Sequence, residues 1–477
     1  MSARDLCYTP AADLVRLYKS RACSPLEVMQ AVLARLDSVN PAVNACVTVA
    51  RESALAEAKR ATAGLKRGRA LPPLFGVPVS IKDLTPTKGI RTTWGSKVHE
   101  HDVPKEDSLV VERLKAAGAI VFAKTNTPEF GAGGNTFNAV FGATRNPWDP
   151  ALTCGGSSGG AAVALATGMG PIAQGSDLGG SLRTPAAFCG VVGFRTTPGL
   201  IPEYPTTLAW DSLSVTGPMA RTVGDVALML STMAGPDDRA PLSYTVDTRE
   251  FLRALKSPSV KGLRIAWTPD LNGLIPVDAE IARIAHGATR VFRSLGARVE
   301  NGSPDFSELN DIVLGTRGVS MVARHADKLP QWRDKLQKGL LWNIEQGLAL
   351  TPRAIAYAQT ARTALWHRVR AFMETRDLLI LPTVAVPPFP VEQPWPTEIN
   401  GKPLDNYTQW FFLTYGITVT GLPVISVPCG FTAAGLPVGL QIVGRRRAEA
   451  AVLRAAAAFE AAAPWRSRIP PVVAARL

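Results

Sequence analysis

Histidine and cysteine are scarce in this sequence of 477 residues, and neither forms a recognisable site. The chain has five histidines and six cysteines, and no cysteine pair is spaced as CxxC. No cysteine lies near a histidine at the spacing of metal ligands, so we expect no metal site, no cofactor and no disulfide framework. No histidine lies in a glycine-rich turn or beside a candidate serine, which argues against a Ser-His-Asp triad. Scattered thiols are typical of a reducing compartment.

Long apolar runs are also missing. No stretch of about 18 uncharged apolar residues exists, which predicts that no segment spans a membrane. The N-terminus lacks the apolar core and the cleavage site of a signal peptide. We therefore expect a cytoplasmic protein without a membrane partner.

Positive charge is in excess but is not concentrated. The net charge is +13, and the tight basic clusters are KRGR at 66–69 and GRRR at 444–447. Because neither cluster is interleaved with aromatic residues, we interpret both as solvated surface and expect no nucleic-acid partner.

Helix and strand signals alternate along the chain and predict an α/β fold. Ser24, Pro25 and Glu27 form a helix start, with an N-cap, a proline in the first turn and a glutamate three residues after the cap. An apolar, β-branched run ends on Lys82, and a helix over 108–117 leads through a glycine turn into the strand AIVFAKT. We expect a central mixed β-sheet covered by helices on both faces.

The whole chain, 1–477, is expected to form one large domain with four parts. These are N-terminal helices at about 1–65, a core at about 70–225 that contains Lys82, Ser157 and Ser181, a mostly helical insertion at about 275–375, and a return to the core sheet with a C-terminal helix at about 376–477.

Three polar positions in apolar or glycine-rich settings suggest chemistry. Lys82 ends its strand, Ser157 and Ser158 lie in CGGSSGG, and Ser181 follows the glycines of GSDLGGSLRTP. A lysine can replace histidine as the base for a serine nucleophile if burial lowers its pKa. The glycines before Ser181 supply backbone amides suited to an oxyanion hole. A phosphate-binding loop is excluded because no Gly-Lys-Ser/Thr follows the glycines.

These segments resemble the amidase signature family. The resemblance begins with GVPVSIKD and AKTNTPEFGAGGNTFNAVFGATRNPWDP, and it continues through GGSSGG and GSDLGGSLRTPAAFCGVVGFRTTPG. Downstream it includes GPMARTVGD, DLLILPT and GLPVISVPCGF. The matching motifs cover most of the chain in the order of the family.

The resemblance implies a role for each matching residue. Ser181 matches the nucleophile that forms the acyl-enzyme, Ser157 the bridging serine that follows a cis peptide bond, and Lys82 the neutral lysine that accepts its proton. Ser158 resembles a residue that supports this network. The oxyanion hole matches the amides of Leu178, Gly179, Gly180 and Ser181.

Other residues near the motifs are interpreted as structural. Asp177 and Arg183 flank the nucleophile and are expected to hold the turn rather than to bind substrate. Cys154 and Cys189 are interpreted as small packing residues, and with Ser181 present a cysteine nucleophile is not expected.

The substrate is the least determined feature. In the family the segment after TNTPEF contributes to the pocket, and here Gly131, Ala132 and Gly133 predict a roomy, apolar one. Aromatic residues in 203–214 and 409–416 either line the pocket or belong to the core. We expect hydrolysis of bulky secondary amides such as anilides, as by aryl acylamidases, with aryl esters and carbamates (urethanes) also accepted.

Two alternatives are left open. The family also contains the amidotransferase component that supplies ammonia to misacylated tRNA in a multi-subunit enzyme, and the basic net charge gives this slight support. An inactive binding protein on the same scaffold is disfavoured by the intact Lys82, Ser157 and Ser181. A homodimer is compatible with the sequence.

Overall fold

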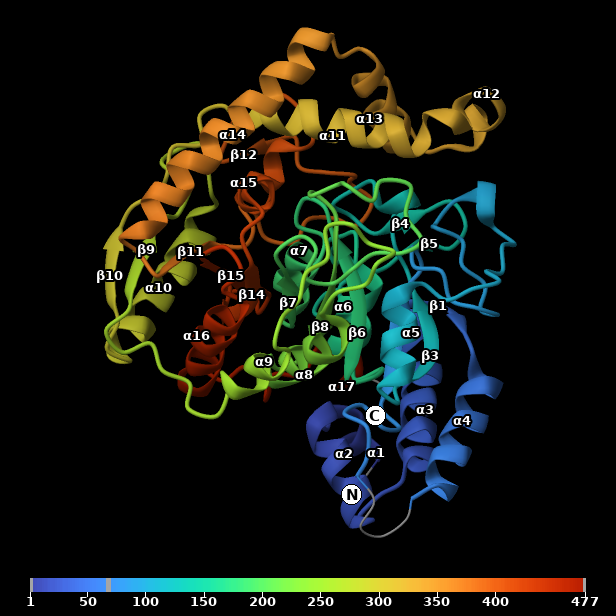
Figure 1. Ribbon diagram of the computed structural model, residues 1–477. Helices are drawn as coiled ribbons and strands as arrows, with labels where there is room; N and C mark the ends of the chain where they lie inside the picture. Colours follow the sequence, from blue (N-terminus) through green and yellow to red (C-terminus); the bar gives the residue numbers. More distant parts are fainter. Residues whose placement is uncertain (1–2, 66–69, 475–477) are drawn as a thin grey trace.

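A mixed eleven-stranded sheet forms the centre of the molecule in the computed structural model, which describes residues 3–65 and 70–474 (Figure 1). The expected α/β class and the central mixed sheet are confirmed. The strand order is β1 (Cys46–Val49), β3 (Ile120–Thr125), β2 (Pro78–Lys82), β6 (Ile172–Asp177), β8 (Val215–Ala220), β7 (Val192–Arg195), β14 (Val424–Phe431), β15 (Pro437–Gly444), β11 (Leu378–Pro382), β9 (Arg264–Trp267) and β10 (Arg298–Asn301).

Strand direction changes within this sheet. β2 is parallel to β3 and to β6, and β9 is parallel to β10 and to β11. The pairs around β8, β7, β14 and β15 are antiparallel. As a result, the carboxyl ends of β2 and β6 meet at one edge of the sheet.

Helices cover both faces of the sheet. Because side chains alternate along a strand, Leu378 and Ile380 of β11 enter one apolar cluster while Leu379 and Leu381 enter another. The first cluster includes α5 (Leu109–Ala116), α8 (Val223–Met233), α10 (Ala279–Ser294) and α16 (Glu449–Ala462). The opposite face is covered by α3 (Pro25–Val43), α6 (Gly159–Ala166), α7 (Arg183–Cys189) and α15 (Phe412–Thr420).

The N-terminal helix α3 begins where the sequence predicts. Ser24 Oγ accepts a hydrogen bond from the amide of Glu27 at 3.2 Å, and the amide of Ser24 donates to Glu27 Oε2 at 2.8 Å, which completes the expected cap of α3. The basic cluster at 66–69 lies outside the described residues. The other N-terminal helices are α1 (Ala3–Tyr8), α2 (Ala11–Ser20) and α4 (Arg51–Ala63).

A group of helices stands over one end of the sheet, at the top of Figure 1. It consists of α11 (Leu309–His325), α12 (Leu329–Trp332), α13 (Lys338–Leu348) and α14 (Pro352–Glu374), and we call it the cap. The segment expected at 275–375 to be mostly helical also contains β10, which pairs with β9 at the sheet edge. The remaining short elements are β4 (Phe137–Asn138), β5 (Gly142–Ala143), α9 (Arg249–Arg253), β12 (Glu398–Ile399), β13 (Lys402–Pro403) and α17 (Pro471–Ala474).

Within 3–65 and 70–474, each helix is either too short or too polar to cross a membrane.

Candidate active site

The topology brings the lysine and the serines together. Lys82 is the last residue of β2, and Asp177 is the last residue of the neighbouring parallel strand β6. Polar residues that follow adjacent parallel strands meet at the carboxyl edge of a sheet, where α/β enzymes place their sites. The turn from β6 into α7, which carries Ser181, therefore lies next to Lys82.

Lys82 is completely buried and is surrounded by hydroxyl groups. Its Nζ lies 2.7 Å from Ser157 Oγ, 3.0 Å from Ser158 Oγ and 3.1 Å from Ser176 Oγ. Burial lowers the pKa of Lys82 to about 7, against the opposing effect of the Asp177 carboxylate. A lysine with this pKa supplies a neutral amine near neutral pH, as a general base requires.

Glycines let the serine loop approach the rest of the core closely. The bond between Gly156 and Ser157 is cis, as the resemblance implies. A Cβ on Gly159 would lie 2.3 Å from Thr136 Oγ1, and a Cβ on Gly160 would lie 2.3 Å from the amide nitrogen of Asn126. No side chain fits in either place, so the glycines seat Ser157 against Lys82.

Ser181 lies next to the serine loop and lines the cavity. The amide of Ser158 donates to the carbonyl of Ser181 at 3.1 Å, which joins the two loops, and Ser157 and Ser181 line the same cavity. The Ser181 hydroxyl, only partly buried, has no hydrogen-bond partner among the described residues. It is therefore free to meet a substrate.

The expected set of four oxyanion amides needs one correction. The amide of Gly180 donates to Asp177 Oδ1 at 2.8 Å and is occupied. The amides of Leu178, Gly179 and Ser181 have no acceptor among the residues described, and all three residues line the cavity. Three amides, rather than four, are available to an oxyanion in this geometry.

Asp177 holds the turn that carries Ser181 through a fully buried charge network. Its carboxylate accepts from Arg183 Nε and Nη2, each at 3.0 Å, from Arg195 Nη1 at 3.3 Å and from the amide of Leu182 at 3.2 Å. Although burial opposes the effect, Arg183 and Arg195 hold the pKa of Asp177 below its usual value. The expected structural role of Asp177 and Arg183 agrees with these contacts.

Replacing Asp177 with asparagine should lower the free energy of unfolding by about 3–5 kcal/mol, because two buried guanidinium groups lose their counter-charge. Urea denaturation followed by tryptophan fluorescence measures the change. Asp13→Asn is the matched control, because Asp13 pairs with Arg16 on the exposed surface of α2 and such pairs contribute little. Equal, small shifts in the two variants would contradict the role of Asp177.

The cavity above the serines has a volume of about 550 Å³. Gly131 and Gly133 line it as expected, whereas Ala132 packs against the cap cluster of Met321, Leu336, Leu340 and Ile344. In 203–214, Glu203, Tyr204, Thr206, Thr207 and Ser214 line the cavity, while Trp210 is 75% exposed elsewhere. In 409–416, Phe411 lines it and Trp410, Phe412 and Tyr415 are buried.

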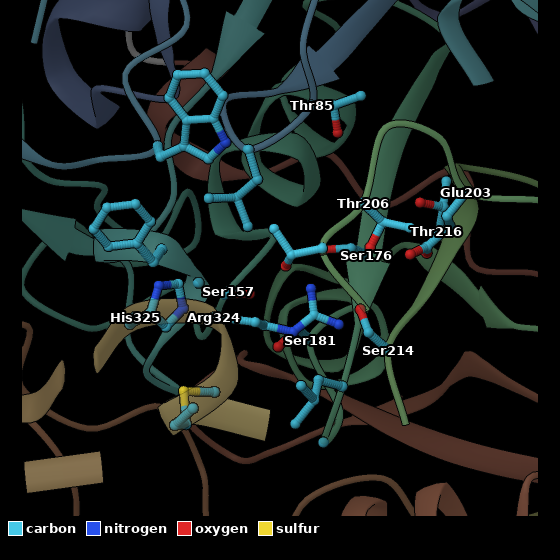
Figure 2. A pocket seen from close by; sticks show the side chains of 18 of the residues that line it. Thr85, Ser157, Ser176, Ser181, Glu203, Thr206, Ser214, Thr216, Arg324 and His325 are labelled. Carbon is cyan, nitrogen blue, oxygen red and sulfur yellow. The ribbon is translucent and has the colours of Figure 1, made fainter. Parts of the chain in front are cut away.

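The cavity is more polar than the glycines suggest, because α11 supplies one wall. Arg317, Met321, Arg324 and His325 share one face of α11 and line the cavity. Figure 2 shows Arg324 and His325 on the same side as Ser157, with Glu203 on the opposite side. These residues were missed, although their spacing of four, three and one marks a single helix face.

Ser176 was also missed. The signal for it was the alternation of Gln174 and Ser176 near the end of a strand that begins with apolar residues, since alternate residues share one face of a sheet. Gln174 Oε1 accepts from the amide of Lys82 at 3.1 Å, and Ser176 contacts Lys82 Nζ.

Cysteine chemistry is disfavoured at this site. All six cysteines are free, and Cys154 and Cys189 are fully buried. Burial raises the pKa of Cys154 to about 12 and that of Cys189 well above its usual value, so neither forms a thiolate readily. In the described part of the chain, no three His, Cys, Asp or Glu side chains are grouped as metal ligands.

Known proteins are similar to this chain in both sequence and fold. The family model for Amidase matches residues 27–453. Acylamidase of Rhodococcus erythropolis is 39% identical over 474 residues, which cover 98% of this chain and 98% of that protein. A glutamyl-tRNA(Gln) amidotransferase subunit from Thermosynechococcus vestitus is 36% identical over 483 residues, covering 96% of this chain and 98% of the relative.

The structural comparison agrees. The crystal structure of a bacterial aryl acylamidase belonging to the amidase signature enzymes matches with a TM-score of 0.91 at 31% identity, covering 98% of this chain and 99% of that one. The expected resemblance is thus confirmed over nearly the whole length. This chain belongs to the Amidase family, the amidase signature enzymes, and is an amide-hydrolysing enzyme.

Proposed function

We propose that the chain cleaves amides through an acyl-enzyme on Ser181, with Lys82 as the base and Ser157 as the proton relay. The observation that carries this proposal is the 2.7 Å contact between Lys82 Nζ and Ser157 Oγ at a buried lysine whose pKa is lowered to about 7. A neutral amine next to a hydroxyl that shares the cavity with Ser181 is the arrangement an activated serine nucleophile needs.

The proton moves in a closed cycle. Neutral Lys82 accepts the proton of Ser157 as Ser157 takes the proton of Ser181, and Ser181 Oγ then forms a bond to the amide carbon. The amides of Leu178, Gly179 and Ser181 stabilise the oxyanion. When the intermediate collapses, the C–N bond breaks and Ser157 returns a proton to the leaving amine. In the second half, Ser157 and Lys82 take a proton from water, and the water oxygen forms a bond to the acyl carbon. The bond between that carbon and Ser181 Oγ then breaks, the acid leaves, and Ser157 returns the proton to Ser181.

Bulky secondary amides, and anilides in particular, are the substrate class that we favour. A cavity of about 550 Å³ exceeds what a small primary amide fills, and the aromatic rings of Trp94, Phe130 and Phe411 line it. The name of the Rhodococcus erythropolis relative, acylamidase, and that of the aryl acylamidase structure support the same class. Aryl esters and carbamates present a similar carbonyl and are included.

The second candidate is an amidotransferase component that acts on misacylated tRNA together with partner subunits. The 36% identity to the glutamyl-tRNA(Gln) amidotransferase subunit from Thermosynechococcus vestitus favours it. The two functions differ in a simple observation: the purified chain alone hydrolyses anilides only under the first proposal.

For the first proposal we place the enzyme in the cytoplasm, because its six cysteines are free.

Acetanilide should be hydrolysed with a kcat/KM about 10- to 100-fold above that of acetamide, because burying one aromatic ring contributes about 1.5–3 kcal/mol to transition-state binding. Product release measured by chromatography, with phenyl acetate and a phenyl carbamate in parallel, tests this. A Ser181→Ala preparation controls for contaminating hydrolases. Activity confined to small primary amides would overturn the substrate class.

A further inference from the structure

Arg317 is a buried cation whose hydrogen-bond partners are neutral side chains. It lies in α11 and is 7% exposed. Its Nε donates to Asn343 Oδ1 at 2.6 Å and its Nη2 donates to the Tyr407 hydroxyl at 2.6 Å. The guanidinium also lies 5.8 Å from the centre of the Tyr407 ring. Among residues 3–65 and 70–474, no carboxylate oxygen lies within 4.0 Å of the Arg317 guanidinium nitrogens, the limit for an ion pair.

The other two cations on the same wall do have acidic neighbours. Arg324 Nη2 lies 2.9 Å from Asp211 Oδ2 and also interacts with Glu203 across the cavity. Lys328 Nζ lies 3.2 Å from Asp327 Oδ1. Burying a cation without a counter-ion is unfavourable, and neutral acceptors compensate for only part of the lost hydration. Among the cavity-lining cations described, Arg317 therefore has the most to gain from an anionic ligand.

A ligand in the catalytic cavity can reach this group. Arg317 lines the cavity that Ser157 and Ser181 line, on the face of α11 that also carries Met321 and Arg324. Asn343 and Tyr407 fix the guanidinium from behind, since Asn343 is 2% exposed and Tyr407 is 8% exposed. A held, planar guanidinium with a remaining donor suits a carboxylate, which it recognises with strong, directional hydrogen bonds.

We infer that Arg317 is a carboxylate-binding residue of this cavity and that the enzyme acts on amides carrying a carboxylate away from the scissile bond. The inference rests on the proposed amide hydrolysis at Ser181 only for its kinetic test. The carboxylate lies either on the acyl part or on the amine part of the amide. In both arrangements the Arg317 guanidinium binds it through the same charge-assisted hydrogen bonds. The charge of Arg317 is neutralised when such a substrate binds.

Two matched substrate pairs test this inference. Acetanilide and 4-acetamidobenzoate differ by a carboxylate on the amine part, and butyranilide and succinanilate differ by one on the acyl part. In at least one pair the carboxylate substrate should have a kcat/KM about 10- to 100-fold above its neutral counterpart, as expected for one charge-assisted hydrogen-bonded pair. The pair that shows the preference identifies the side.

The preference should depend on Arg317 and on no other cation of the wall. Arg317→Gln should reduce the ratio within the preferred pair to about one, and Arg317→Lys should retain part of it, since lysine keeps the charge but not the planar fork. Lys328→Gln is the matched control and should leave the ratio unchanged. Equal rates within both pairs, or a ratio that survives Arg317→Gln, would overturn the inference.

A binding measurement keeps the inference testable if turnover is absent or if Arg317→Gln does not fold. In calorimetric titration, the Ser181→Ala protein should bind succinanilate or 4-acetamidobenzoate more tightly than the neutral counterpart. The double variant that carries both Ser181→Ala and Arg317→Lys should bind the carboxylate compound more weakly. If neither pair is hydrolysed but this difference persists, amide hydrolysis fails and the carboxylate site stands. If anilides are hydrolysed and the difference is absent, only the carboxylate site fails.

Discussion

Replacing Ser181 with alanine should lower kcat for an anilide by about 10⁴- to 10⁶-fold, the loss seen when a serine nucleophile is removed. The hydroxyl of Ser181 has no hydrogen-bond partner among residues 3–65 and 70–474, so the urea midpoint should stay near that of the unchanged protein. The combination of lost turnover with retained stability is what distinguishes a nucleophile from a structural serine. Chromatographic assay and urea denaturation measure the two quantities.

Covalent labelling provides the control for this prediction. A fluorophosphonate should add one group to the unchanged protein and none to Ser181→Ala, as measured by intact mass. Ser214→Ala is the matched variant, because Ser214 lines the same cavity but makes no contact with Lys82. Ser214→Ala should be labelled normally. Stoichiometric labelling of Ser181→Ala at another residue would refute the assignment.

Replacing Lys82 with methionine should lower kcat by about 10²- to 10⁴-fold, the usual contribution of a general base. The unchanged enzyme should also lose activity in acid. Only the neutral amine accepts the proton of Ser157, and burial lowers the pKa of Lys82 to about 7. Activity is therefore full above that pKa and falls about tenfold per pH unit below it. The measurement is kcat/KM as a function of pH.

Lys124 offers a matched control for the pH profile. It is also fully buried with a pKa lowered by burial to about 7. Its Nζ donates to Thr87 Oγ1 at 3.0 Å and to Thr92 Oγ1 at 2.9 Å, and not to the serines of the site. Lys124→Met should keep the acid midpoint of the unchanged enzyme. A midpoint that disappears in Lys124→Met, or a flat profile down to about pH 5, would contradict Lys82 as the base.

Local signals explain why Lys82, Ser157 and Ser181 could be expected to lie together, as the structure shows. Lys82 is the last residue of one buried strand and Ser181 follows the end of another, and the glycines around Ser157 are conspicuous in the sequence. The Gly180 correction could not be foreseen, because it depends on how the Asp177 carboxylate folds back onto the turn. Its geometry depends on the buried Arg195, whose position is set by another strand.

The parts of the fold that were missed have physical reasons too. β1 and β10 are the two edge strands, and each has four residues and a single neighbour. So short a segment with one exposed edge carries little alternation to recognise. The polar cavity wall was missed because α11 is far from the catalytic motifs in the sequence, and only the packing of the cap brings Arg317 to the cavity.

The order in which the strands occur along the chain has a consequence for how the protein folds. β14 and β15 are the last two strands in the sequence, yet they lie in the interior of the sheet. Arg183, two residues after Ser181, donates to Gln441 Oε1 of β15 at 2.8 Å across 258 residues. Contacts of such long range form late and slow folding. The turn that carries Ser181 is therefore completed by a strand that lies far away in the sequence, and folding must bring β15 into the sheet before Arg183 can make this contact.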